Sequence, residues 1–100
     1  MILPFTPKAT VNLSASSSTG RVQMYTEISG RAAVIVTNPA GNPTVFINFG
    51  GSTVEATTSA GLPILAGTAQ TFTLGASQTH VAGITASGSG TIYFTPGEGI

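Results

Sequence analysis

The stretch from Arg31 to Gly50 reads RAAVIVTNPAGNPTVFINFG and contains the clearest strand–turn–strand pattern of the chain. Ala32 to Thr37 is a continuous apolar run, which is typical of a strand that is covered on both faces. Asn38 to Pro43 combine proline, which fixes φ, with glycine and asparagine, which tolerate left-handed backbone. Residues Thr44 to Phe49 then show period-two alternation, with Val45, Ile47 and Phe49 on one side. The stretch therefore predicts two β-strands, the first of them central in its sheet.

The same alternation recurs on both sides of this stretch, between clusters of glycine, serine and proline. Its further segments are Ala9–Ser14, Arg21–Ile28, Thr53–Thr57, Gln70–Leu74, Thr79–Ala86 and Thr91–Thr95. Residues 58–68 are interpreted as a looped connection whose aliphatic side chains plug an end of the core. Eight short strands without any window of helical period favour an all-β fold, an antiparallel sandwich or barrel, with an eight-stranded jelly roll as first choice.

The length of 100 residues allows one hydrophobic core, so we expect a single domain over residues 1–100. Residues 1–8 are interrupted by two prolines, and residues 96–100 are rich in proline and glycine. We interpret them as an N-terminal arm and a C-terminal tail, which either dock on the body or reach a partner. The cation of the first segment, Lys8, follows its apolar residues, the reverse of a secretory signal. We therefore expect a protein made and used without Sec export.

Charge is scarce throughout the chain. Three Lys or Arg residues balance three Glu residues, so the net charge is zero. A neutral chain with three scattered cations lacks the phosphate contacts of a nucleic-acid-binding protein and the polybasic patch of a membrane-binding one. The longest aliphatic run is also far too short to span a bilayer. We therefore expect neither nucleic acid nor membrane as a partner.

Few residues could carry catalysis or bind a metal. The only histidine, His80, shares a strand face with apolar residues and is interpreted as structural, with an acid–base or ligand role as the alternative. Glu27, Glu55 and Glu98 are dispersed, and the absence of cysteine excludes thiolate and disulfide chemistry. We therefore expect no catalytic residue, no cofactor, no metal site and no enzymatic activity.

The composition favours a role in assembly instead. A soluble β protein normally protects its sheet edges with Lys and Glu, and this chain has 16 Thr and 10 Ser in place of such charges. Its edges and termini would be covered if neighbouring copies contacted them, which favours a homo-oligomer. Tyr25 shares the alternating face of Arg21 and is expected to be an exposed contact, whereas Arg21 and Arg31 are either solubilising charges or interface anchors. The candidate assembly contacts are Ile2, Leu3, Pro4, Phe5, Arg21, Tyr25, Arg31, Glu98 and Ile100.

Four segments together resemble small virion proteins of tailed bacteriophages. These segments are Thr44–Gly50, Leu62–Gly67, Thr79–Ala82 and Thr91–Gly99. The resemblance covers residues 31–100, and the ending YFTPGEG after a Gly-Ser-Gly hairpin is its most specific part. Size and all-β character are most similar to capsid decoration, or cement, proteins.

The resemblance implies a small β-sandwich, often trimeric, that binds the major capsid protein on the outer face of a phage head and clamps it. It also implies a location on the virion after synthesis in the host bacterial cytoplasm. Residues 1–30 are not covered by it. A neck, tail or fibre-associated virion subunit is an alternative, and a carbohydrate-binding β-sandwich module is another. The latter requires several coplanar exposed aromatics, for which Tyr25 is the candidate.

Overall fold

A computed structural model describes residues 5–28 and 31–99, which form nine β-strands. The strands are β1 (Phe5–Pro7), β2 (Val11–Ala15), β3 (Gly20–Gln23), β4 (Ala32–Asn38), β5 (Val45–Gly50), β6 (Leu62–Ile64), β7 (Thr68–Leu74), β8 (His80–Thr85) and β9 (Gly90–Gly99). No helix that could cross a membrane is found in these two ranges.

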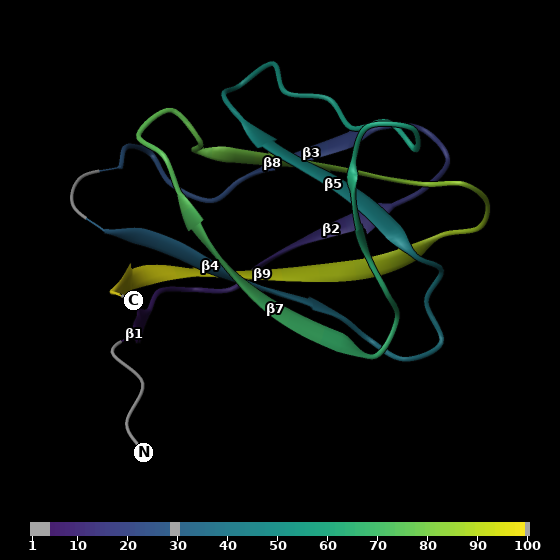
Figure 1. The fold of residues 1–100 in the computed structure, drawn as a ribbon, viewed down its shortest axis with the longest axis horizontal. Coiled ribbons are helices and arrows are strands. Elements are labelled where there is room, and N and C mark those ends of the chain that lie inside the picture. The colour runs from purple at the N-terminus through teal and green to yellow at the C-terminus, as the bar shows by residue number, and fades with distance from the viewer. Residues whose placement is uncertain (1–4, 29–30, 100) are drawn as a thin grey trace.

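The strands form two antiparallel sheets that lie as two layers (Figure 1). The first sheet has the order β2-β9-β4-β7, and β1 pairs with the far half of β9. The second sheet has the order β3-β8-β5-β6. This arrangement of eight strands is that of a jelly roll, and it confirms the predicted all-β sandwich. β1 is an additional ninth strand.

The core lies between the two sheets and is built mainly of β-branched side chains. β4 lies between β9 and β7, which confirms its predicted central position. Its Val34 and Val36 are fully buried, as is Phe94 of β9. The second sheet contributes Val45, Ile47 and Val81 to the same cluster. Alternating strands from both sheets thus supply one continuous hydrophobic core.

Residues 53–57 form no strand, in contrast to the prediction. They belong to a long connection from β5 to β6 that is held against β3. Arg21 Nη1 donates a hydrogen bond to the carbonyl oxygen of Val54 at 2.9 Å, and the Ala56 N–H donates to Thr19 Oγ1 at 3.0 Å. The strand that pairs with β5 at the sheet edge is instead Leu62–Ile64, which lies within residues 58–68, predicted to be a looped connection without a strand. Proline is tolerated at such an edge position, so Pro63 did not prevent pairing.

Pro96 to Gly99 continue β9, whereas the sequence pattern predicted an irregular tail from residue 96. The reason is the place of Pro96, which lies between the end of the β2 pairing at Phe94 and the start of the β1 pairing at Gly97. The Pro96 carbonyl oxygen accepts a hydrogen bond from the Lys8 N–H at 2.7 Å, so its backbone faces this junction. The junction requires no N–H donor from residue 96, and proline therefore fits.

Candidate functional site

Several predicted contact residues meet at the end of the sandwich where β1 and β9 pair. Phe5 is the register partner of Gly99, and Glu98 is the partner of both Thr6 and Ala32. Arg31 directly precedes Ala32 and is exposed. The structure thus brings Phe5, Arg31 and Glu98 to one end, although they are far apart in the sequence. Ile2, Leu3, Pro4 and Ile100 lie outside the described residues.

Tyr25 is buried at this end, with 5% of its surface exposed, so the prediction of an exposed contact residue was wrong. The cause is a break in the alternation after β3. The N–H groups of Met24 and Tyr25 both donate to the Thr79 carbonyl oxygen, at 2.8 and 3.2 Å. Two residues therefore oppose one, as in a β-bulge, and the bulge turns the tyrosine inward.

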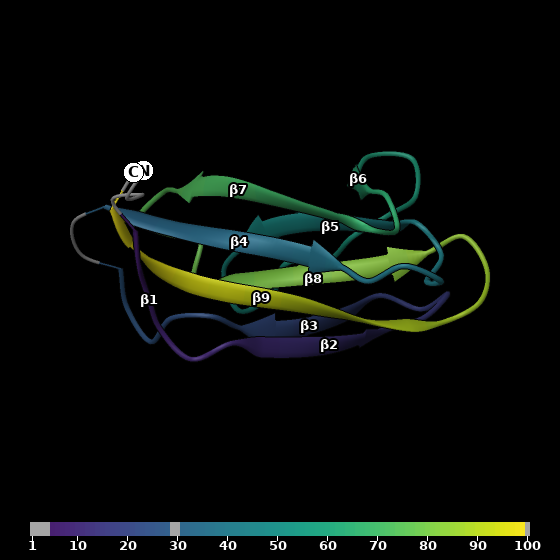
Figure 2. The ribbon, with the colours of Figure 1, turned by 90° about the horizontal axis from the view of Figure 1, so that it is seen from below.

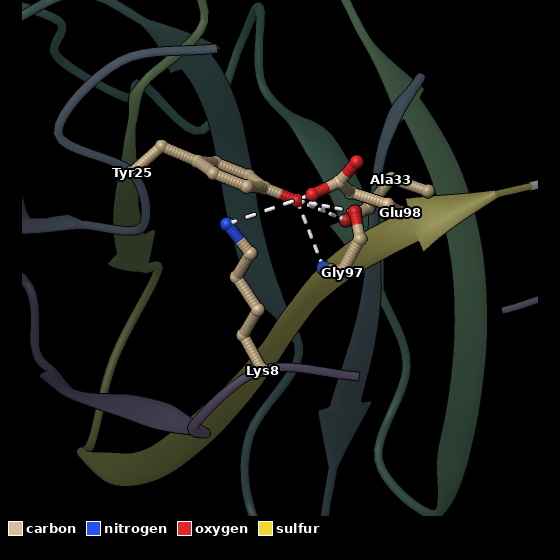
Figure 3. A network of polar contacts seen from close by, with 5 residues as sticks. All are labelled: Lys8, Tyr25, Ala33, Gly97 and Glu98. Carbon is tan, nitrogen blue, oxygen red and sulfur yellow. Dashed lines mark hydrogen bonds and ion pairs between the residues drawn. The ribbon is translucent and has the colours of Figure 1, made fainter. Parts of the chain in front are cut away.

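The Tyr25 hydroxyl lies between two backbone strands (Figure 3). It accepts a hydrogen bond from the Gly97 N–H at 2.8 Å. It lies 2.9 Å from the Ala33 carbonyl oxygen and 2.5 Å from the Gly97 carbonyl oxygen, and its single proton serves one of them at a time. The side chain thereby joins the end of β3 to β4 and β9, and it holds this end of the sandwich closed.

The exposed charge of Lys8 lies over the ring of this tyrosine, and that of Glu98 lies near Lys8 (Figure 3). Lys8 Nζ is 5.2 Å from the centre of the Tyr25 ring and 3.9 Å from Glu98 Oε2. Both charged side chains are more than half exposed, so the ion pair contributes little to stability. A contact of Glu98 with a partner stays a prediction. Phe5 lies beside these two charged side chains, half-buried.

Arg21 lies away from this end, on β3. Its guanidinium is exposed and holds the β5–β6 connection through the Val54 carbonyl oxygen. This contact gives Arg21 a structural role in positioning that connection. An interface role for Arg21 stays a prediction, as it does for Arg31.

The sheet edges differ in how they are protected from pairing with other chains. β3 carries Arg21, whereas β1 and β6 have three residues each and contain a proline. β7 is seven residues long, lies at the open edge of the first sheet (Figure 2), and contains neither a charge nor a proline. Charges, prolines and shortness are the devices that prevent edge pairing in monomers. β7 is the longest edge strand in the described chain, and it has none of them.

Exposed apolar side chains lie next to this edge. Leu62 and Leu65 are 43% and 58% exposed, and both precede β7 in the chain. Their exposure contradicts the expectation that the aliphatic side chains of residues 58–68 plug an end of the core. Ile64, which lies between the two leucines, is buried as expected. No charged residue occurs from residue 56 to residue 97, so β6, β7 and the segment between them carry no charge.

A polar network that the sequence did not reveal fixes the turn after β4. Asn38 is fully buried, and its amide nitrogen donates to the carbonyl oxygens of Pro43 and Ile64, at 3.1 and 2.9 Å. Its amide oxygen accepts from Asn42 Nδ2 at 3.0 Å, and that same nitrogen donates to the Thr91 carbonyl oxygen at 2.8 Å. The Asn-Pro-Ala-Gly-Asn-Pro pattern indicated a turn, but backbone dihedral preferences do not reveal which asparagine points into the core.

Neither a pocket nor a group of three metal-ligating side chains is found within the part of the chain that the structure describes. Nδ1 of His80 lies 2.8 Å from Thr79 Oγ1, its immediate neighbour in the chain. Among the aromatic side chains of the described residues, Tyr93 is exposed, whereas Phe49 and Phe72 pack against one another and are half-buried.

Comparisons with known proteins identify the fold. No protein-family model and no curated protein matches the chain. Among solved structures, a similar fold occurs in a chain from a study described as "Bacillus endospore appendages form a novel family of disulfide-linked pili". The TM-score is 0.58, with 97% of this chain and 89% of that chain covered, at 16% sequence identity. At this identity, the similarity establishes a shared fold.

Proposed function

We propose that the chain is a non-enzymatic structural subunit of a larger protein assembly. In its more specific form, the proposal is a decoration subunit that binds the major capsid protein on the outer surface of a tailed-phage head and stabilises the head. The subunit would be made in the cytoplasm of the host bacterium and end up on the virion.

One observation carries the proposal: the neutral flank formed by β6 and β7. Soluble monomers normally keep charges at such a surface, and they rarely leave a long, uncharged strand at a sheet edge. Here Leu62, Leu65 and the whole of β7 are left without a nearby charge on their own segment. Coverage of this flank by neighbouring molecules removes both the exposed apolar area and the unpaired backbone groups.

The structural comparison supports the general form of the proposal. The similar fold belongs to a protein described as forming pili, which are assemblies of many subunits. That protein is described as disulfide-linked, whereas this chain contains no cysteine. Copies of this chain can therefore not be linked through disulfides of these 100 residues.

The resemblance to phage virion proteins supports the specific form. Thr44–Gly50 and Thr91–Gly99, two of its segments, correspond to β5 and β9, which build the framework of the sandwich. Leu62–Gly67 is different, because it includes the exposed leucines of the neutral flank. This segment would therefore contribute contacts as well as framework.

Binding to phage heads tests the specific form. Purified chain is mixed with DNA-filled heads that have been stripped of it, and the bound amount is measured after sedimentation. We expect saturable binding, with a copy number that follows the capsid lattice, and heads that survive higher temperature once occupied. Heads that bind no chain, or that are equally robust without it, would contradict the decoration role.

The copy number of the chain in native particles tests the neck or tail alternative. A native copy number close to that of the major capsid protein indicates the head, whereas the copy number of a single ring indicates neck or tail. The carbohydrate-binding alternative loses its candidate residue, because Tyr25 is buried and its hydroxyl is used inside the fold.

A further inference from the structure

The open edge of β7 has a definite hydrogen-bonding pattern, which follows from two contacts of β4. The Gly67 N–H donates to the Asn38 carbonyl oxygen at 2.7 Å, so this carbonyl points toward β7. The Ala33 carbonyl oxygen instead lies within hydrogen-bonding distance of the Tyr25 hydroxyl, which also contacts Gly97 of β9. Even-numbered residues of β4 therefore direct their backbone groups toward β7, and odd-numbered residues direct theirs toward β9.

The register carries this alternation over to β7. Asn38 and Val36 are the partners of Thr68 and Gln70, so the even-numbered residues of β7 face β4. Ala69, Thr71 and Thr73 then direct their N–H and C=O groups to the open edge. All three side chains are exposed. The edge thus presents three backbone donors and three acceptors, centred on Thr71.

This pattern is complementary to itself. When two β7 strands run antiparallel with Thr71 opposite Thr71, Ala69 of each copy faces Thr73 of the other. Three donors from each of two copies then form six hydrogen bonds, and every outward N–H and C=O group is used. The side chains brought together are threonine with threonine and alanine with threonine, so no like charges meet.

We infer that two copies of the chain pair through their β7 edges about a two-fold axis at Thr71, which joins their first sheets into one continuous sheet. This inference deepens the structural role proposed above by naming a second copy as the partner of the neutral flank. The two-fold contact closes on itself, so it yields pairs and not an open filament.

The contact is small, because one edge of seven residues buries less area than the roughly 1,000 Å² of a stable interface. Association in free solution is therefore weak and depends on concentration. On a surface that holds many copies side by side, the high effective concentration makes the same contact persistent.

Single-cysteine cross-linking tests the register, and the absence of native cysteine makes this direct. Two T71C chains place their Cα atoms about 5.5 Å apart across the axis. Two T73C chains are offset by four residues along the strand, roughly 14 Å. With a thiol cross-linker shorter than this offset, we expect dimers from T71C and few from T73C alone. A mixture of T73C and A69C chains should restore the dimer. Equal cross-linking of all single variants, or none, would overturn the inference.

A charge pair provides the second test. Thr71→Lys and Thr71→Glu each place like charges opposite one another, so each chain alone should sediment at the 10.0 kDa of one chain at every concentration. An equimolar mixture should regain the concentration-dependent increase toward twice that mass. Thr6→Lys, on β1 at the opposite edge of the sheet, is the matched control and should associate like the unmodified chain. A trimeric mass for the unmodified chain, or an unaltered mass for Thr71→Lys, would refute the β7 contact. Neither test uses phage heads, so edge pairing and head binding can fail independently.

Discussion

At the scale of single residues, the hydroxyl of Tyr25 has the clearest stabilising role. Tyr25→Phe keeps the ring in place but leaves the Gly97 N–H without the acceptor shown in the structure. An unsatisfied buried backbone group costs about 1–3 kcal/mol. We therefore expect the free energy of unfolding, measured by urea denaturation, to fall by this amount, and the Tm to fall with it. Tyr93→Phe is the control, because Tyr93 is exposed and should change stability by less than about 0.5 kcal/mol. Equal stability of the two variants would contradict the role of the hydroxyl.

Asn38 offers a second test at this scale. In Asn38→Asp, an oxygen replaces the nitrogen that donates to Pro43 and Ile64, and a buried carboxylate faces two carbonyl oxygens. We expect a loss of at least about 3 kcal/mol in the free energy of unfolding, because a buried and unpaired charge is strongly destabilising. Asn12→Asp, at an exposed position of β2, should be nearly neutral. Thermal unfolding of both variants measures the difference.

At the scale of elements, β1 depends on the missing side chain of Gly97. A Cβ added there would lie 2.5 Å from Phe5 Cζ and would also collide with the Thr6 carbonyl oxygen. We therefore expect Gly97→Ala to displace β1 from β9 and to speed trypsin cleavage after Lys8. Gly51→Ala is the control, because the nearest atom to its Cβ is 3.9 Å away. Unchanged cleavage in Gly97→Ala would show that β1 tolerates the added methyl group.

The elements also show how far the sequence could predict this structure. The apolar run of β4 and the alternation in β2, β5, β7 and β8 were sufficient to predict these strands, because each strand has one or two buried faces. Tyr25 could not be placed, since a bulge reverses the side on which later residues point. Pro63 and Pro96 were read as breaks, and only their places at an edge and at a junction make them compatible with strands. The open edge of β7 could not be identified either, because strand order follows from contacts that are distant in the sequence.

At the scale of the whole molecule, the small number of charges makes a prediction about salt. Contacts made by a neutral flank are not screened, so binding to heads should be almost unchanged when sodium chloride is raised from about 50 to about 500 mM. Over this range the screening length falls roughly threefold, and binding that depends on ion pairs would weaken. Occupancy of sedimented heads at each salt concentration is the measurement. A steep decrease would move the contact surface to the charged end at Lys8 and Glu98.

The pairing of β1 with the end of β9 has a mechanical consequence. Phe5 lies opposite Gly99 in an antiparallel pair. Tension applied between these two ends therefore breaks the β1–β9 hydrogen bonds one after another. Tension applied along two paired strands from their opposite ends is instead shared by all of their hydrogen bonds at once. We therefore expect β1 to separate from β9 first when the subunit is pulled by its two ends.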